Sequence, residues 1–261
     1  MLADVFESVG ALLIDLDGVL YIEEEPIAGA VDAVESFRGR GLTLRSVTNT
    51  TAYSRDRTLE KLGRLGFRVA SAELVTPAAL AVQRCRERGH RRVALIMNEE
   101  VKHDFAELQE TEGDADAVII GDLGSAFGYD VLNHAFRQVM DGAELIALQK
   151  NRYWMRADGL SLDAGPFVAA IEFATNREAY VVGKPAAAFF DQVLADIGVS
   201  PAAAVMVGDD VESDIGGALH SGLLAILVRT GKYREETAQE SEVEPTEVVD
   251  SIAEVPRLLG C

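Results

Sequence analysis

Strand-like and helix-like segments alternate almost throughout this sequence, and that alternation limits its fold more than any other feature. The apolar run at 11–14 predicts a strand buried on both faces, and 30–40 follows with apolar residues at helical spacing. A second strand over 42–50 and a helix beginning near Ser54 repeat the pattern. Such alternation predicts parallel sheets joined by crossover helices. We therefore expect an α/β fold with a doubly wound, Rossmann-like parallel sheet.

The polar residues that could carry chemistry lie in short stretches near the two ends of the chain. Between them, residues 52–182 hold almost none, although strand and helix patterns continue there. That length is enough for a domain inserted into the core. The sequence therefore predicts a catalytic core formed by residues 1–77 and 179–261, with an inserted α/β cap domain over residues 78–178.

Charge and composition narrow the class of partner. The chain has 261 residues and a net charge of −19, and an acidic surface repels nucleic acid. Its longest apolar runs are far shorter than the roughly 20 residues of a membrane span. The N-terminus lacks the pattern of a signal peptide, and Cys85 and Cys261 are too few for a disulfide framework. We expect a cytoplasmic protein that binds neither nucleic acid nor a membrane.

Polar side chains follow four of the predicted strands. If those strands are parallel neighbours, their carboxyl ends open on one edge of a sheet, where ligands of such folds collect. Several carboxylates there would repel one another unless a hard cation joined them, and Mg²⁺ suits oxygen ligands. The residues concerned are Asp15 and Asp17, Thr48 and Asn49, Lys184, and Asp209 with Asp210 and Asp214.

The spacing of these residues predicts phosphoryl transfer to a carboxylate. Asp15 is expected to attack phosphorus and form an aspartyl phosphate. Asp17, two residues later on the same face, is placed to protonate the leaving group and then to deprotonate water. Mg²⁺, Lys184 and the Thr48 hydroxyl would neutralise charge on the transferring oxygens. The expected substrate is a small phosphorylated molecule.

Four motifs, in this order, carry a resemblance to a known family: "DLDGVL", "TNT", "GKP" and "GDDVESD". They resemble the motifs of the haloacid dehalogenase-like hydrolase superfamily, and the insert resembles the large cap of its NagD-like phosphatases. The resemblance covers nearly the whole chain. Within the superfamily, the chain resembles the haloacid dehalogenase-like hydrolase domain-containing proteins and the phospholysine phosphohistidine inorganic pyrophosphate phosphatases.

The resemblance implies a role for each motif residue. Asp15 would be nucleophile and Mg²⁺ ligand, and Asp17 would be acid/base and bind the metal through its backbone carbonyl. Thr48, Asn49 and Lys184 would bind the phosphoryl group. Asp209 would bind Mg²⁺ directly, Asp214 would hold a metal-bound water, and Asp210, where relatives often carry Asn, would support the ligands from outside.

Other functions stay open at this stage. A bacterial receiver domain fits poorly, because its threonine and lysine follow all of its acidic residues in the sequence, whereas here Thr48 and Lys184 precede Asp209. A haloalkanoic dehalogenase also fits poorly, because it needs no Mg²⁺ site. A phosphomutase stays open as an alternative. A binding protein that has lost turnover also stays open, although an inactive relative would be expected to have lost Asp15 or Asp17, and both are present. Tyr153 or Trp154 is expected to pack in the cap core, with closure over the substrate as the alternative. The cap is also a candidate surface for a homodimer, while the physiological substrate is undetermined.

Overall fold

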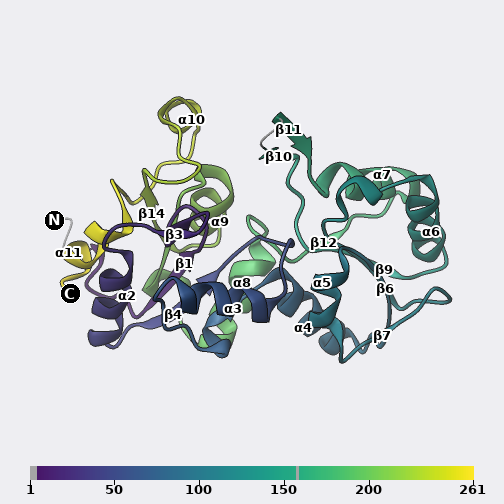
Figure 1. The fold of residues 1–261 in the computed structure, drawn as a ribbon, viewed down its shortest axis with the longest axis horizontal. Helices are drawn as coiled ribbons and strands as arrows, with labels where there is room; N and C mark the ends of the chain where they lie inside the picture. The colour runs from purple at the N-terminus through teal and green to yellow at the C-terminus, as the bar shows by residue number, and fades with distance from the viewer. Residues whose placement is uncertain (1–4, 157–158) are drawn as a thin grey trace. The chain divides into compact units, whose positions relative to one another are not determined.

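The computed structural model describes residues 5–156 and 159–261, without the side chains of 154–156. The chain forms two compact units (Figure 1). The second unit is larger than the predicted cap of residues 78–178, because it runs from Thr76 to Gly183 and also includes the short segment Asn49–Arg55. The first unit comprises Met1–Thr48, Asp56–Val75 and Lys184–Cys261, and the second comprises Asn49–Arg55 and Thr76–Gly183.

Six parallel strands form the sheet of the first unit, in the order β15-β14-β13-β1-β4-β5. The central strands β1 and β13 are completely buried, as their uninterrupted apolar sequences predict. Ile14 of β1 lies opposite Val207 of β13, and Asp15 lies opposite Val47 of β4. The strands are β1 (Ala11–Asp15), β4 (Thr43–Val47), β5 (Leu74–Val75), β13 (Ala204–Gly208), β14 (Leu224–Val228) and β15 (Glu247–Val249).

Helices pack on this sheet through the apolar faces that the sequence predicts. In α2 the buried side chains include Val34 and Phe37, which join the core with Leu12 and Ile14 of β1. A small antiparallel pair, β2 (Tyr21–Ile22) and β3 (Glu25–Pro26), follows β1. The helices are α2 (Ala30–Gly39), α3 (Arg55–Arg64), α8 (Ala187–Ile197), α9 (Gly217–His220), α10 (Glu235–Glu240) and α11 (Val255–Leu259).

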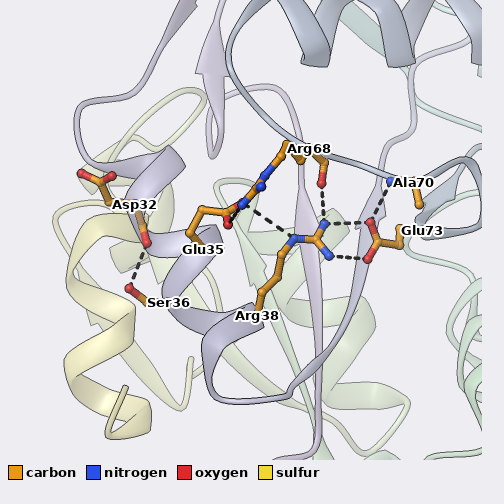
Figure 2. Close-up of polar contacts among 7 residues, drawn as sticks. All are labelled: Asp32, Glu35, Ser36, Arg38, Arg68, Ala70 and Glu73. Carbon is orange, nitrogen blue, oxygen red and sulfur yellow. Dashed lines mark hydrogen bonds and ion pairs between the residues drawn. The ribbon is translucent and has the colours of Figure 1, made fainter.

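An arginine on α2 connects that helix to the segment before β5 (Figure 2). The Arg38 guanidinium donates to both carboxylate oxygens of Glu73, at 2.6 and 2.7 Å, and to the carbonyl of Arg68 at 2.6 Å. Glu73 also accepts a hydrogen bond from the Ala70 backbone at 2.8 Å, and Arg68 pairs with Glu35. Bidentate arginine–carboxylate contacts fix geometry as well as charge, so this network holds α2 against the sheet.

The second unit has its own parallel sheet, in the order β12-β9-β8-β6-β7. Helix α4 begins where Thr76 accepts a hydrogen bond from Ala79 at 3.2 Å, with Pro77 in the first turn. The strands are β6 (Arg92–Ile96), β7 (Gln109–Glu110), β8 (Ala117–Ile120), β9 (Glu144–Ala147) and β12 (Tyr180–Val181), and the helices are α4 (Pro77–Arg88), α5 (Glu99–Lys102), α6 (Tyr129–Met140) and α7 (Gly165–Thr175).

A separate antiparallel hairpin, β10 (Tyr153–Arg156) with β11 (Gly159–Leu162), also belongs to the second unit. Tyr153 pairs with Leu162, and both side chains are exposed, at 59% and 62%. Tyr153 is therefore not the residue of the pair Tyr153 and Trp154 that packs in a core, because the hairpin lies outside the main sheet and this side chain is exposed. The side chain of Trp154 lies outside the described residues.

One predicted strand joins a different sheet from the one expected. The segment at 180–184 was predicted to bring Lys184 to the edge of the core sheet, but β12 pairs with β9 in the second unit. Lys184 is instead the first residue of the chain's return to the first unit, before a cis bond to Pro185. Among the described residues, no helix combines the length and apolarity needed to cross a membrane.

Candidate active site

Asp15, Lys184 and Asp214 form a buried ion-pair network in the first unit. Lys184 Nζ lies 2.5 Å from Oδ1 of Asp15 and 2.7 Å from Oδ1 of Asp214. Asp15 is the last residue of β1, and its neighbours β13 and β4 end at the same edge of the sheet. The Lys184 side chain is only 2% exposed, so its charge is committed to these two carboxylates.

Asp209, directly after β13, completes a cluster of three buried carboxylates. One oxygen from each of Asp15, Asp209 and Asp214 can be chosen so that all lie within 4.8 Å of one another. Asp209 Oδ2 accepts a hydrogen bond from the Lys232 backbone at 2.6 Å, whereas its Oδ1 is buried with no hydrogen-bond partner. A buried carboxylate oxygen left without a donor is costly, and a cation is the partner that this donor set fits.

Two glycines make room for that carboxylate. Gly18 and Gly231 have φ angles of 86° and 61°, and a Cβ on either residue would collide with Oδ2 of Asp209. Only glycine combines such a backbone with such a close approach. Three convergent carboxylates, an oxygen without a partner and this close glycine cradle therefore fit a hard divalent cation such as Mg²⁺.

Burial and mutual repulsion shift the titration of the cluster. Burial, with the charges of Asp15 and Asp214, raises the pKa of Asp209 to about 8. Burial also raises the pKa of Asp214 to about 6, against the opposing pull of Lys184. The pKa of Asp15 is raised by burial and drawn down by Lys184. The metal-free cluster therefore holds protons that free carboxyl groups would have lost, and a bound cation would favour their release.

Asp17 lies just beyond β1, with an exposed position beside Tyr21. The Tyr21 hydroxyl donates to Asp17 Oδ2 at 3.3 Å, and the ring of Tyr21 has Lys61 Nζ 4.1 Å from its centre. Although the residue is exposed, protein atoms crowd its carboxyl, and this desolvation raises the pKa of Asp17 against the pull of Lys61. A carboxyl whose pKa is raised is suited to donate a proton.

A π-helix, Val211–Gly216, shapes the last motif. Asp210 caps it, since its Oδ1 accepts hydrogen bonds from Glu212 at 3.2 Å and Ser213 at 2.9 Å. Asp214 Oδ2 accepts one from the Asp210 backbone at 3.2 Å, which turns the Asp214 carboxylate back toward the cluster. This segment is thus wound more widely than an α-helix, a form frequent at functional sites.

The two residues of the second motif fall in different units. Thr48 is buried directly after β4, beside the residue that pairs with Asp15, and its backbone donates to Val75 at 3.3 Å. Asn49 belongs to the second unit, where its Oδ1 lies against Gly183. Thr48 thus belongs to the same unit as the carboxylate cluster and follows the strand next to Asp15.

Lys232 is a residue of this site to which the sequence reasoning gave no role. Its backbone holds Asp209, and its ammonium lies 3.7 Å from Oδ2 of Asp210. A lysine after a strand and a glycine is an ordinary loop residue, so spacing alone carries no signal for it. Its position after the neighbouring strand β14 is the one clue that topology adds.

The sequence is similar to known protein families over most of its length. Residues 12–110 match the family described as haloacid dehalogenase-like hydrolase, and residues 181–255 match the family described as HAD-hydrolase-like. Human haloacid dehalogenase-like hydrolase domain-containing protein 2 is 43% identical over 235 residues, which cover 90% of this chain and 89% of that protein. Human phospholysine phosphohistidine inorganic pyrophosphate phosphatase is 38% identical over 257 residues, covering 96% and 94%.

Solved structures resemble this one over almost its whole length. 4-Nitrophenylphosphatase from Thermotoga maritima has a TM-score of 0.89 at 24% identity, covering 98% of this chain and 99% of that one. NagD from E. coli has a TM-score of 0.84 at 23% identity, covering 94% and 98%. A glycerol phosphate phosphatase from Mycobacterium tuberculosis, in complex with magnesium, has a TM-score of 0.81 at 29% identity, covering 98% and 77%.

Fold, site and relatives define one class of protein. This chain belongs to the haloacid dehalogenase-like hydrolase family, and its relatives include phosphatases. The predicted family and the predicted α/β fold with parallel sheets are confirmed.

Proposed function

We propose that this chain is a Mg²⁺-dependent phosphatase that hydrolyses small phosphorylated metabolites through an aspartyl phosphate on Asp15. The observation that carries the proposal is the contact of Lys184 with Asp15 and Asp214, beside the unpartnered oxygen of Asp209. A nucleophilic carboxylate, a buried ammonium and a cation-binding cluster are the parts that phosphoryl transfer to an aspartate needs.

Asp15 is the nucleophile in this proposal. Its carboxylate attacks phosphorus, the bond between phosphorus and the leaving oxygen breaks, and the phosphoryl group is then attached to Asp15. Lys184 favours the ionised form of Asp15 against the effect of burial, and it neutralises charge on the phosphoryl oxygens as the bond forms. The Thr48 hydroxyl, buried next to this strand end, is the proposed hydrogen-bond donor to the same group.

Asp17 is the proposed acid and base. It gives its proton to the leaving oxygen in the first step and takes a proton from water in the second, when water attacks the phosphoryl group on Asp15. The raised pKa of Asp17 supports the first of these roles. The Tyr21 hydroxyl holds the carboxylate in place at 3.3 Å.

Mg²⁺ would be held by the carboxylates of Asp15 and Asp209 and by the backbone carbonyl of Asp17, with Asp214 binding through a water molecule. When bound, it supplies positive charge to the cluster and to the phosphoryl oxygens. The three-carboxylate cluster supports this assignment, and so does the relative whose structure contains magnesium. Asp210 supports the ligands indirectly, because it caps the turn that positions Asp214.

Phosphate release tests the function. The substrates to compare are 4-nitrophenyl phosphate, phosphate monoesters, phosphoamino acids and pyrophosphate, each with Mg²⁺ and with EDTA. Release that requires Mg²⁺ and is lost in Asp15→Asn supports the proposal. A product with its phosphoryl group moved and no free phosphate would indicate a phosphomutase, and Mg²⁺ binding without turnover would indicate a binding protein.

We also propose that residues 78–178 form an α/β cap inserted into the core, that Asn49 contributes to phosphoryl binding, and that the cap is the surface of a homodimer. The protein acts in the cytoplasm and binds neither nucleic acid nor a membrane. Sedimentation of the full chain at several concentrations measures the oligomeric state, and cell fractionation measures the location.

A further inference from the structure

Lys232 is a second lysine at the carboxylate cluster, and the proposed steps do not use its side chain. It follows β14, after Gly231, whose backbone lies against the Asp209 carboxylate. The Lys232 backbone donates to Oδ2 of Asp209 at 2.6 Å. The start of this side chain is therefore fixed beside a proposed metal ligand, within the first unit.

The ammonium of Lys232 is held much more loosely than that of Lys184. Lys232 Nζ lies 3.7 Å from Oδ2 of Asp210, longer than a hydrogen bond, and its side chain is 67% exposed. Lys184, by contrast, is 2% exposed and makes two close ion pairs. An exposed pair of this kind contributes little to stability, so Lys232 can turn to another anion at small cost.

The charges around Lys232 show why a substrate would need it. Lys232 lies in a region rich in negative charge, because its backbone donates to Asp209 and its ammonium lies 3.7 Å from the carboxylate of Asp210. A lysine is ordinarily charged at neutral pH. A ligand with one phosphoryl group can be balanced by Lys184 and a divalent cation, whereas any further anionic group would be repelled unless another cation met it.

We propose that Lys232 binds a second anionic group on the leaving part of the substrate, and that the site therefore favours phosphoryl compounds that carry one. This inference rests on the proposed phosphatase reaction and names its substrate class. The second group is a phosphoryl group or a carboxylate, both of which accept charge-assisted hydrogen bonds from an ammonium.

Steady-state kinetics with Mg²⁺ test the inference on three substrates. Pyrophosphate has a second phosphoryl group, phosphoglycolate has a carboxylate, and 4-nitrophenyl phosphate has no second anion. In Lys232→Met we expect KM to rise on the order of tenfold for one or both of the first two substrates. For 4-nitrophenyl phosphate we expect a change of less than about threefold, and Lys232→Arg should restore most of the loss.

Arg229→Met is the matched control. Arg229 precedes the same loop and is exposed, but it pairs with Asp250 at 2.8 Å. Its removal changes the net charge by the same amount, so we expect all three KM values to stay close to those of the wild type. An equal loss for all three substrates in Lys232→Met, or an equal effect of Arg229→Met, would overturn the inference, because Lys232 would then act only through its general charge.

A binding measurement separates this inference from the proposed function. Calorimetry on Asp15→Asn with Mg²⁺ compares methylenediphosphonate, which has two phosphoryl-like groups, with methylphosphonate, which has one. Adding Lys232→Met should weaken binding of the first on the order of tenfold and leave the second nearly unchanged. If the wild type releases no phosphate, the proposed function fails, while this difference in binding still decides whether Lys232 meets a second anion.

Discussion

Lys184 Nζ lies 2.5 Å from Oδ1 of Asp15, although 169 positions separate the two residues in the sequence. The same ammonium lies 2.7 Å from Asp214. Three charged groups that the chain supplies from distant segments are thus packed against one another inside the first unit. The network depends most on Lys184, because its removal would leave two buried carboxylates without a cation, whereas Lys184 keeps a partner when either aspartate is replaced.

Asp15→Asn should abolish phosphate release while leaving the fold intact. Asparagine has the same size but cannot form the aspartyl phosphate, so we expect turnover to fall by roughly four orders of magnitude or more. Phosphate release and thermal unfolding, measured side by side, check both parts. Retention of most of the Mg²⁺-dependent activity would contradict the mechanism.

Lys184→Met should destabilise the protein by about 3 to 5 kcal/mol, because Asp15 and Asp214 would lose their buried cation. Urea unfolding near pH 7.5 measures the change in the free energy of unfolding. Arg229→Met, at an exposed ion pair with Asp250, provides a control that should scarcely alter it. Similar effects of the two substitutions would show that the buried network is not what stabilises this edge of the sheet.

The stability of the metal-free protein should fall as the pH rises from about 4 to about 8. The pKa of Asp209 is raised to about 8 and that of Asp214 to about 6, so the folded protein holds protons that the unfolded chain has already released. Raising the pH then favours unfolding. Thermal unfolding in EDTA across this interval measures the slope. The slope should be shallower in Asp209→Asn, and an unchanged slope there would refute the assignment.

Gly18→Ala should weaken Mg²⁺ binding more than its backbone strain accounts for. A Cβ at this position would strike the Asp209 carboxylate and displace a proposed ligand. Gly41→Ala is the matched control, because Gly41 also has a positive φ, 80°, but has open space around its Cβ position. Calorimetric titration with Mg²⁺ should show a loss in Gly18→Ala alone. Equal affinities in the two variants would remove the argument for a close cradle.

Arg38→Met should lower stability by about 1 to 2 kcal/mol without affecting activity. It removes the partly buried bidentate contact with Glu73 and the hydrogen bond to the Arg68 carbonyl (Figure 2). Urea unfolding and a phosphate-release assay measure the two effects. Glu73→Gln in the same background should add little, since its partner has gone, and a fully additive loss would indicate that the two residues act independently.

Sequence alone predicted the first unit well where its strands are buried on both faces. The uninterrupted apolar runs of β1 and β13 can only be central strands, and the carboxylates that follow them had to meet at one edge. For this reason the sequence alone predicted that Asp15, Asp209 and Asp214 lie together in one cluster. The inference also needed β1 and β13 to be parallel neighbours, as they are in the sheet, because only then do their carboxyl ends lie at the same edge.

Other features could not be predicted from spacing. The residues of β12 form a strand pattern that fits either sheet, and only pairing with β9 decides between them. The wider turn of Val211–Gly216 has the sequence of an ordinary helix start. Lys232 resembles any lysine in a loop until β14 is placed next to β13. In each case the deciding information is a contact between distant segments, which a local pattern does not contain.

Lys184 follows directly after the last residue of the second unit, and this has a consequence for how the architecture can evolve. Residues 76–183 form most of the second unit. They follow β5 of the first unit, and the next residue, Lys184, belongs to the first unit again. Insertions and deletions far from the ends of residues 76–183 leave the position of Lys184 at the site unchanged. A change of one residue in the length of the segment between β12 and Lys184 would move that side chain. The second unit can therefore change in sequence and length during evolution, whereas the number of residues between β12 and Lys184 is expected to stay constant.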